Sequence, residues 1–187
     1  MSYKWWLFIA TFLFLIGISS GLILGLTTPI GITDLLFEEI ATLEELADLL
    51  APLPQTSVFA LIFIKNVSAV LISVALSPIF CLVPVVALIF NGGLIGFVSA
   101  LVIQEKSIGY LLAGLLPHGI LELPALIIGE AVALSFGTSV MLALLKREKR
   151  NMLPHNLRQN LRYLIVALVL FLPAAIIETY LTPLLLS

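Results

Sequence analysis

Residues 5–26 read WWLFIATFLFLIGISSGLILGL, 22 consecutive positions without a charged side chain. A helix needs about 20 predominantly apolar residues to cross the hydrocarbon core of a bilayer. A secretory signal peptide has a shorter apolar core, roughly 7 to 15 residues, followed by a small-residue cleavage site, and no A-x-A pattern follows here. The stretch therefore predicts a retained transmembrane helix, with Tyr3, Trp5 and Trp6 at the headgroup level.

The composition of the whole chain agrees with a membrane environment. Of its 187 residues, 61% are hydrophobic and 11% are charged, whereas soluble domains have roughly 45–50% and 25%. Apolar segments of spanning length lie at about residues 5–27, 57–77, 85–104, 109–145 and 163–186. We therefore expect a single domain over residues 1–187, an all-α polytopic bundle of about five spans in the lipid bilayer.

The fourth apolar segment differs from the others because it is longer than one crossing requires. Pro117, Gly119 and Pro124 interrupt it, and proline inside a helix removes a backbone hydrogen bond and kinks or breaks the helix. Two structures remain open for residues 109–145. One is a kinked, tilted span, and the other is a re-entrant half-helix that breaks near Pro117–Gly119 and restarts.

Charge is distributed in two opposed blocks. Residues 33–51 hold six acidic side chains and no lysine or arginine, and their apolar residues recur at helical spacing, which predicts an amphipathic surface helix. A basic loop contains Lys146, Arg147, Lys149, Arg150, Arg158 and Arg162. Because basic loops mark the cytoplasmic side, five crossings predict a cell (cytoplasmic) membrane protein with its N-terminus inside. The acidic helix and the C-terminus are then outside.

Small residues recur every fourth position on two predicted spans. The first set is Gly17, Gly21 and Gly25, and the second is Gly129, Ala133 and Gly137. Such faces let two helix backbones approach closely. They predict either packing within the bundle or contact between two copies of the chain, a homodimer or larger homo-oligomer.

Ionisable side chains inside spans are the main functional candidates, because a charge in hydrocarbon is costly without a partner or a role. We predict one polar layer formed by Lys65, Asn66, Asn91, His118, Glu122 and Glu178. Lys65 is expected to pair with Glu122 or Glu178. The layer has two interpretations: a satisfied network that fixes helix packing, or a pathway for a proton, an ion or a small solute. The role of Glu130 stays open.

Enzymatic and metal chemistry have weak support. His118, Glu122 and Glu178 are weak candidates for a metal site, but no H-E-x-x-H or G-x-S-x-G pattern is present. The serines at positions 68, 73 and 77 are expected to bond to their own helix backbone. We expect no catalytic residue and no cofactor. The net charge of −2 also gives no reason to expect a nucleic-acid partner.

One short motif carries a family resemblance. The run LPHGILELPA at residues 116–125 includes Pro117, His118, Gly119, Glu122 and Pro124. Together with Phe90-Asn91-Gly92, Ile177-Glu178 and Pro183, it resembles the stage II sporulation protein M family, a membrane domain of unknown function. The resemblance covers about residues 55–185. Lys65 departs from the family pattern, which has paired asparagines at the Lys65-Asn66 position.

The resemblance implies a non-enzymatic membrane scaffold. In spore formers the family member anchors peptidoglycan-cleaving partners during sporulation. An acidic helix outside the membrane would suit docking of an extracytoplasmic protein partner, although a solvated surface is the commoner explanation. The alternative function is a transporter or channel for a proton, ion or small solute that uses the polar layer.

Overall fold

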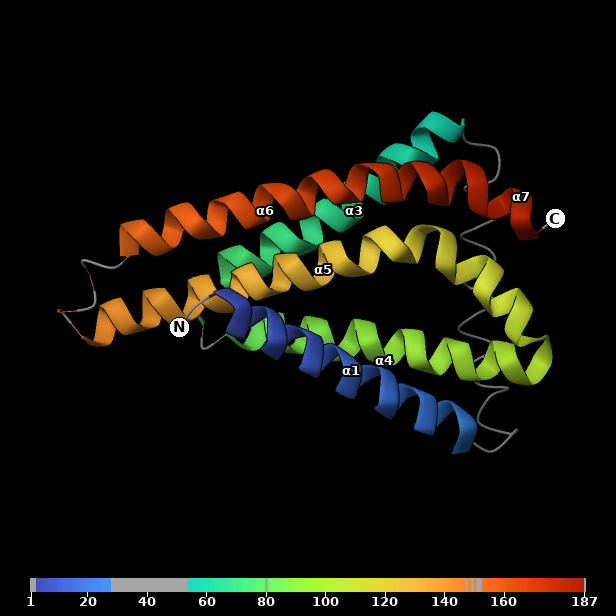
Figure 1. Cartoon of the computed structure of the whole chain (residues 1–187), viewed down its shortest axis with the longest axis horizontal. Helices are drawn as coiled ribbons and strands as arrows, with labels where there is room; N and C mark the ends of the chain where they lie inside the picture. The colour runs from blue at the N-terminus through green and yellow to red at the C-terminus, as the bar shows by residue number, and fades with distance from the viewer. Residues whose placement is uncertain are drawn as a thin grey trace.

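The computed structural model describes residues 3–27, 54–79, 81–146, 148, 150 and 153–186, and these ranges are helical with short turns (Figure 1). The predicted surface helix at residues 33–51 and the side chain of His118 lie outside the described part. The helices are α1 (Tyr3–Thr27), α3 (Gln55–Leu76), α4 (Leu82–Glu105), α5 (Ile108–Leu145), α6 (Leu153–Ile176), the π-helix η2 (Ile177–Leu181) and α7 (Thr182–Leu186).

The predicted number of spans is confirmed. Within the described ranges, five helices are long and apolar enough to cross a membrane. They are Tyr3–Thr27, Gln55–Leu76, Leu82–Glu105, Gly119–Leu145 and Leu153–Leu185. Large hydrophobic side chains, among them Phe8, Ile64 and Val169, are more than half exposed, as expected for a surface that faces lipid instead of water. Which end of the bundle faces the cytoplasm remains a prediction.

The fourth span is kinked and not broken. Pro117 and Pro124 both lie inside a continuous helix, α5. Figure 1 shows the first part of α5 crossing one end of the bundle before the helix bends and runs back along the long axis. Each proline removes one backbone hydrogen bond and its ring crowds the preceding turn. Of the two structures left open by the sequence, the kinked helix is therefore the one present.

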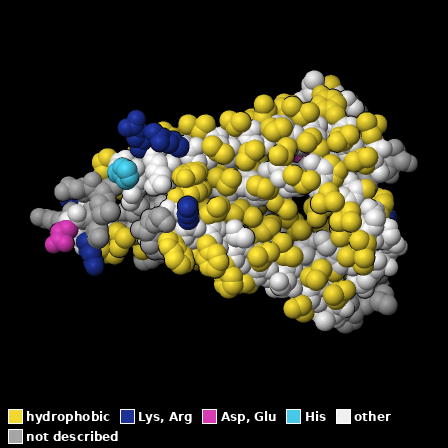
Figure 2. Space-filling view, viewed as in Figure 1, with side chains coloured by type: hydrophobic (Ala, Val, Ile, Leu, Met, Phe, Trp, Pro, Cys, Tyr) yellow, Lys and Arg dark blue, Asp and Glu magenta, His cyan; other side chains and the backbone are white. Residues whose placement is uncertain are grey.

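The fifth span begins earlier than predicted. The basic segment up to Arg162 was expected to be a loop, but α6 begins at Leu153 and contains both Arg158 and Arg162. Pro154 fits in the first helical turn, where no backbone hydrogen bond is lost. Figure 2 shows Lys and Arg side chains gathered mainly at this end of the molecule, while hydrophobic side chains cover most of the visible flank.

Helix α1 lies on α4 with the backbones in close contact. Gly17, Gly21 and Gly25 are all buried, and a Cβ atom added to Gly17 would lie 2.5 Å from the carbonyl oxygen of Ile89. A Cβ atom on Gly21 would overlap the carbonyl group of Gly93. The first glycine face therefore packs within the chain, and a homo-oligomer would need another face.

The second small-residue face brings α5 against α3. A Cβ atom on Gly129 would lie 2.6 Å from Val70, and one on Gly137 would overlap the carbonyl group of Ser77. Helix α5 also contacts α1, α4 and α6, so it is the central helix of the bundle. Tyr3, the first residue of α1, also contacts α5. It is buried, and its hydroxyl donates a hydrogen bond of 2.9 Å to the carbonyl oxygen of Ile128 in α5.

Substitution of Gly21 by alanine should destabilise the protein by about 1–3 kcal/mol, because the added methyl group meets backbone that cannot rotate away. The measurement is thermal unfolding in detergent. Gly93→Ala is the matched control on the same interface, since its added Cβ has 3.7 Å to the nearest atom, the carbonyl oxygen of Gly17. Equal losses for the two variants would contradict the packing described here.

Candidate functional site

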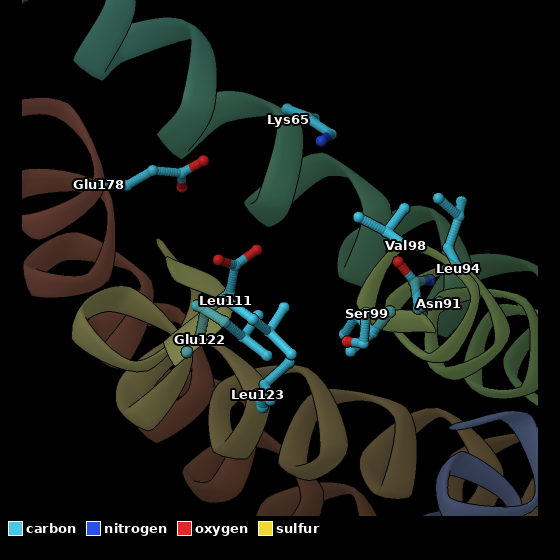
Figure 3. Close-up of a pocket in the computed structure, with 12 residues that line it drawn as sticks. Lys65, Asn91, Leu94, Val98, Ser99, Leu111, Glu122, Leu123 and Glu178 are labelled. Carbon is cyan, nitrogen blue, oxygen red and sulfur yellow. The ribbon is translucent and has the colours of Figure 1, made fainter. Parts of the chain in front are cut away.

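Three helices and the π-helix surround a cavity of about 320 Å³, called here the large cavity. Its polar walls come from Lys65 on α3, Asn91 and Ser99 on α4, Glu122 on α5 and Glu178 on η2. Apolar side chains such as Leu94 and Val98 complete the lining. Figure 3 shows the carboxylates of Glu122 and Glu178 turned toward the open space between the helices. The structure thus brings four of the six predicted polar residues to one cavity.

Lys65 lines the same cavity as Glu122 and Glu178, and its expected ion pair with one of them stays a prediction. Lys65 is exposed, whereas Glu122 and Glu178 are partly buried. An ammonium group inside a span is tolerable where it lines a cavity that water can enter. Lys65 therefore contributes a positive charge to the cavity wall.

Asn66 is the partner that the structure gives to Glu122. The Nδ2 atom of Asn66 donates a hydrogen bond of 3.0 Å to Oε1 of Glu122. Asn66 and Lys65 are adjacent on α3, so the helix presents an amide to α5 and an ammonium to the cavity. A carboxylate that accepts such a bond is held in a fixed orientation. Asn66 therefore positions Glu122 at the edge of the large cavity.

Two predicted members of the layer play different parts. The amide of Asn91 donates 2.8 Å to the carbonyl oxygen of Ala87 in its own helix, so Asn91 lines the cavity without bonding to another helix. The placement of the His118 side chain is outside the described part. Among the described side chains, no group of three His, Cys, Asp or Glu is arranged to hold a metal ion, and no metal role is assigned to Glu122 or Glu178.

Glu178 reaches the large cavity from a π-helix, which the sequence reasoning missed. The backbone N–H of Thr182 bonds to the carbonyl oxygen of Ile177, which is the i to i+5 pattern of a π-helix. Pro173 lies inside the preceding helix α6. π-turns are rare and are frequent at functional sites. In the sequence, Pro173 shortly before Glu178 was the feature that could have predicted irregular backbone here.

A second polar contact between α3 and α5 was also missed. Glu130 is 1% exposed, and its carboxylate accepts a hydrogen bond from the hydroxyl of Ser73. Ser73 was expected to bond to its own backbone, as Ser77 does with the carbonyl oxygen of Val74. The spacing held a signal, because Ser73 follows Asn66 by seven residues and Glu130 follows Glu122 by eight, which is about two helical turns in each case. Two parallel helices with such similar spacing can form two contacts.

Comparison with known proteins identifies the family. The model of the family described as Stage II sporulation protein M matches residues 10–183. The chain belongs to the stage II sporulation protein M family. A relative, an uncharacterized protein of Methanocaldococcus jannaschii, is 28% identical over 126 residues, which are 67% of this chain and 71% of that protein. No solved structure matches the chain.

Family membership gives the sequence motif a structural setting. Pro117, Gly119, Glu122 and Pro124 all lie on the kinked part of α5. Gly119 and Glu122 line the large cavity, and Pro117 and Pro124 flank them along the helix. Lys65 lines the same cavity. The run LPHGILELPA at residues 116–125 therefore lies where α5 bends and meets this cavity.

Substitution of Asn66 by leucine should lower the free energy of unfolding by about 1–3 kcal/mol, because Glu122 loses a donor in a partly buried place. Thermal unfolding in detergent measures the effect. Asn91→Leu is the matched control, since the Asn91 amide bonds only to its own helix. A loss for Asn91→Leu as large as that for Asn66→Leu would argue against the Asn66–Glu122 contact.

Proposed function

We propose that this membrane protein admits a small polar solute or an ion into the large cavity, as a transporter or channel does. The observation that supports the proposal is the lining of the large cavity by an ammonium group and two carboxylates from different helices. Its volume of about 320 Å³ is room for about ten water molecules at roughly 30 Å³ each. The volume is at the lower end for ligand pockets, which favours a small ligand.

The charge of the lining favours a cation or a zwitterion over an anion. Lys65 contributes +1, and Glu122 and Glu178 contribute −2 when ionised, so the sum is −1. The Asn66 amide keeps one oxygen of Glu122 occupied. A cation in the cavity would gain from the two carboxylates, and Lys65 would attract the acidic end of a zwitterion.

Family membership favours a second candidate function, a non-enzymatic scaffold or assembly subunit for envelope partners that remodel peptidoglycan. Its proposed docking element is the acidic segment at residues 33–51, which falls outside the described residues. In this function the polar side chains of the bundle would fix helix packing only. The involvement of sporulation rests on the family description alone.

Cysteine labelling tests the first function. In a Cys81→Ser background, Ser99→Cys should react with a membrane-impermeant, charged thiol reagent, because Ser99 lines the large cavity and thiolates form only where water enters. Ile72→Cys is the control, since Ile72 is 55% exposed on the flank of the bundle and would face lipid. Labelling of Ser99→Cys no faster than that of Ile72→Cys would exclude a cavity open to water.

Neutralising the acidic segment tests the scaffold. The variant replaces Asp34, Glu38, Glu39, Glu44, Glu45 and Asp48 by their amides. If these charges bind a basic partner surface, peptidoglycan-cleaving activity should copurify with the parent from native membranes and be lost with the variant. Glu105→Gln, at the end of α4, is the control for a general charge effect. Copurification that is unchanged in the six-fold variant would count against this docking element.

A further inference from the structure

Glu130 is the most deeply buried ionisable side chain among the described residues, and the large cavity does not include it. It is 1% exposed, within the apolar walls of the bundle. The partner seen for its carboxylate is a neutral hydroxyl, that of Ser73. A lone hydroxyl does not balance a full negative charge. A carboxyl group in such a place either stays protonated or exchanges its proton with a neighbour.

A second cavity leads to this carboxylate. This small cavity has a volume of about 140 Å³. Ser73 and Glu130 form part of its wall. Lys65, Asn91 and Glu122 line it as well, and these three residues also line the large cavity. The two cavities therefore adjoin. The small cavity has room for about four water molecules at roughly 30 Å³ each, and its polar walls supply hydrogen-bond partners for them.

The ends of three helices show how far the small cavity extends along the bundle. Ser73 lies three residues before the end of α3, and Val83, another lining residue, is the second residue of α4. Tyr3, the first residue of α1, bonds to Ile128, two residues before Glu130. The small cavity thus reaches toward the end of the bundle where α1 begins. Glu178 belongs to η2, which directly precedes α7, and Figure 1 shows α7 at the opposite end.

We infer that Glu122 and Glu130 exchange a proton through water in the small cavity, so that Glu130 is the proton-binding group at the end of the pathway remote from Glu178. The inference deepens the proposed function, on which it rests, by naming the transported or coupled ion. A proton leaves the carboxylic acid of Glu122 to a water molecule, and the last water of the chain protonates the carboxylate of Glu130. The hydroxyl of Ser73 donates to the ionised form of Glu130.

Among the described side chains, Lys65 on α3 and Glu122 on α5 are the other ionisable groups that line the small cavity. Glu178 on η2 lines the large cavity. Helix α4 contributes Asn91 and helix α6 contributes Phe171, neither of which titrates. Lys65 lies on the wall that both cavities share.

The alternative role of Glu130 is structural, as a hydrogen-bonded anchor between α3 and α5. Glu130→Gln separates the two roles, because glutamine keeps the side-chain shape and can still accept from Ser73 but cannot carry a proton. Ser73→Ala is the complementary variant, since it removes the anchor and leaves the carboxylate. A proton-carrying role predicts loss of function in the first variant and a smaller effect in the second.

The test is proton uptake into proteoliposomes of the full chain, driven by a potassium diffusion potential and followed with an internal pH dye. The parent should exceed empty vesicles, Glu130→Gln and Glu122→Gln should each lower the uptake by about tenfold or more, and Ser73→Ala by less. Glu105→Gln should retain the parental rate, because Glu105 is not among the residues that line either cavity. Parental uptake in Glu130→Gln, or a parent no faster than empty vesicles, would overturn the inference.

A second measurement separates this inference from the proposed function and from misfolding. Ser99→Cys labelling, measured in the Glu130→Gln background, reports whether the large cavity still forms and admits water. If Ser99→Cys is still labelled but the parent shows no proton uptake, the large cavity would be kept as a ligand site and the proton exchange would be rejected.

Infrared difference spectra give an independent readout. Acidification should add a carboxylic acid band that is absent in Glu130→Gln, and a band unchanged by that substitution would reject Glu130 as the proton-binding group.

Discussion

The parallel contact between α3 and α5 determines how the polar residues of this bundle meet. Gly129 and Gly137 allow α5 to lie directly against Val70 and Ser77 of α3. Without water in the hydrocarbon, close packing of small residues is the main attraction between spans. The register between α3 and α5 that these glycine contacts set aligns Asn66 with Glu122 and Ser73 with Glu130. A different register would leave two carboxylates facing apolar side chains, so packing and polar contacts support the same arrangement.

The sequence predicts this fold well because each span is a local property. Length and hydropathy located the five spans, Pro117 and Pro124 located the bend, and glycine spacing located the tight faces. The start of α6 was placed too late because Arg158 and Arg162 were taken as loop residues, although charged side chains are common on a helix that extends beyond the membrane. The π-helix was missed because its hydrogen-bond pattern depends on packing around Pro173 as much as on composition.

The site was harder to predict than the fold. Because a charge in lipid is costly, ionisable and polar side chains within the spans were predicted as site residues, and four of them do line one cavity. Their partners depend on the register between helices, which the periodicity of a single helix does not fix. Glu122, one of the two carboxylates predicted to pair with Lys65, accepts a hydrogen bond from Asn66. Ser73 was assigned to its own backbone but donates to Glu130. A comparison of spacings on two helices at once would have suggested the two contacts between α3 and α5.

The π-helix at Ile177–Leu181 has a mechanical consequence for the bundle. A π-turn holds one residue more than an α-helix fits into the same rise. If the extra residue moves along the helix by one turn, the side chains it passes rotate by about 100° around the axis. Glu178 lies within this turn, so a migrating bulge would swing its carboxylate away from the neighbouring helices while both ends of the helix stay in place. The irregular turn thus supplies a rotary degree of freedom that a regular helix of the same length does not have.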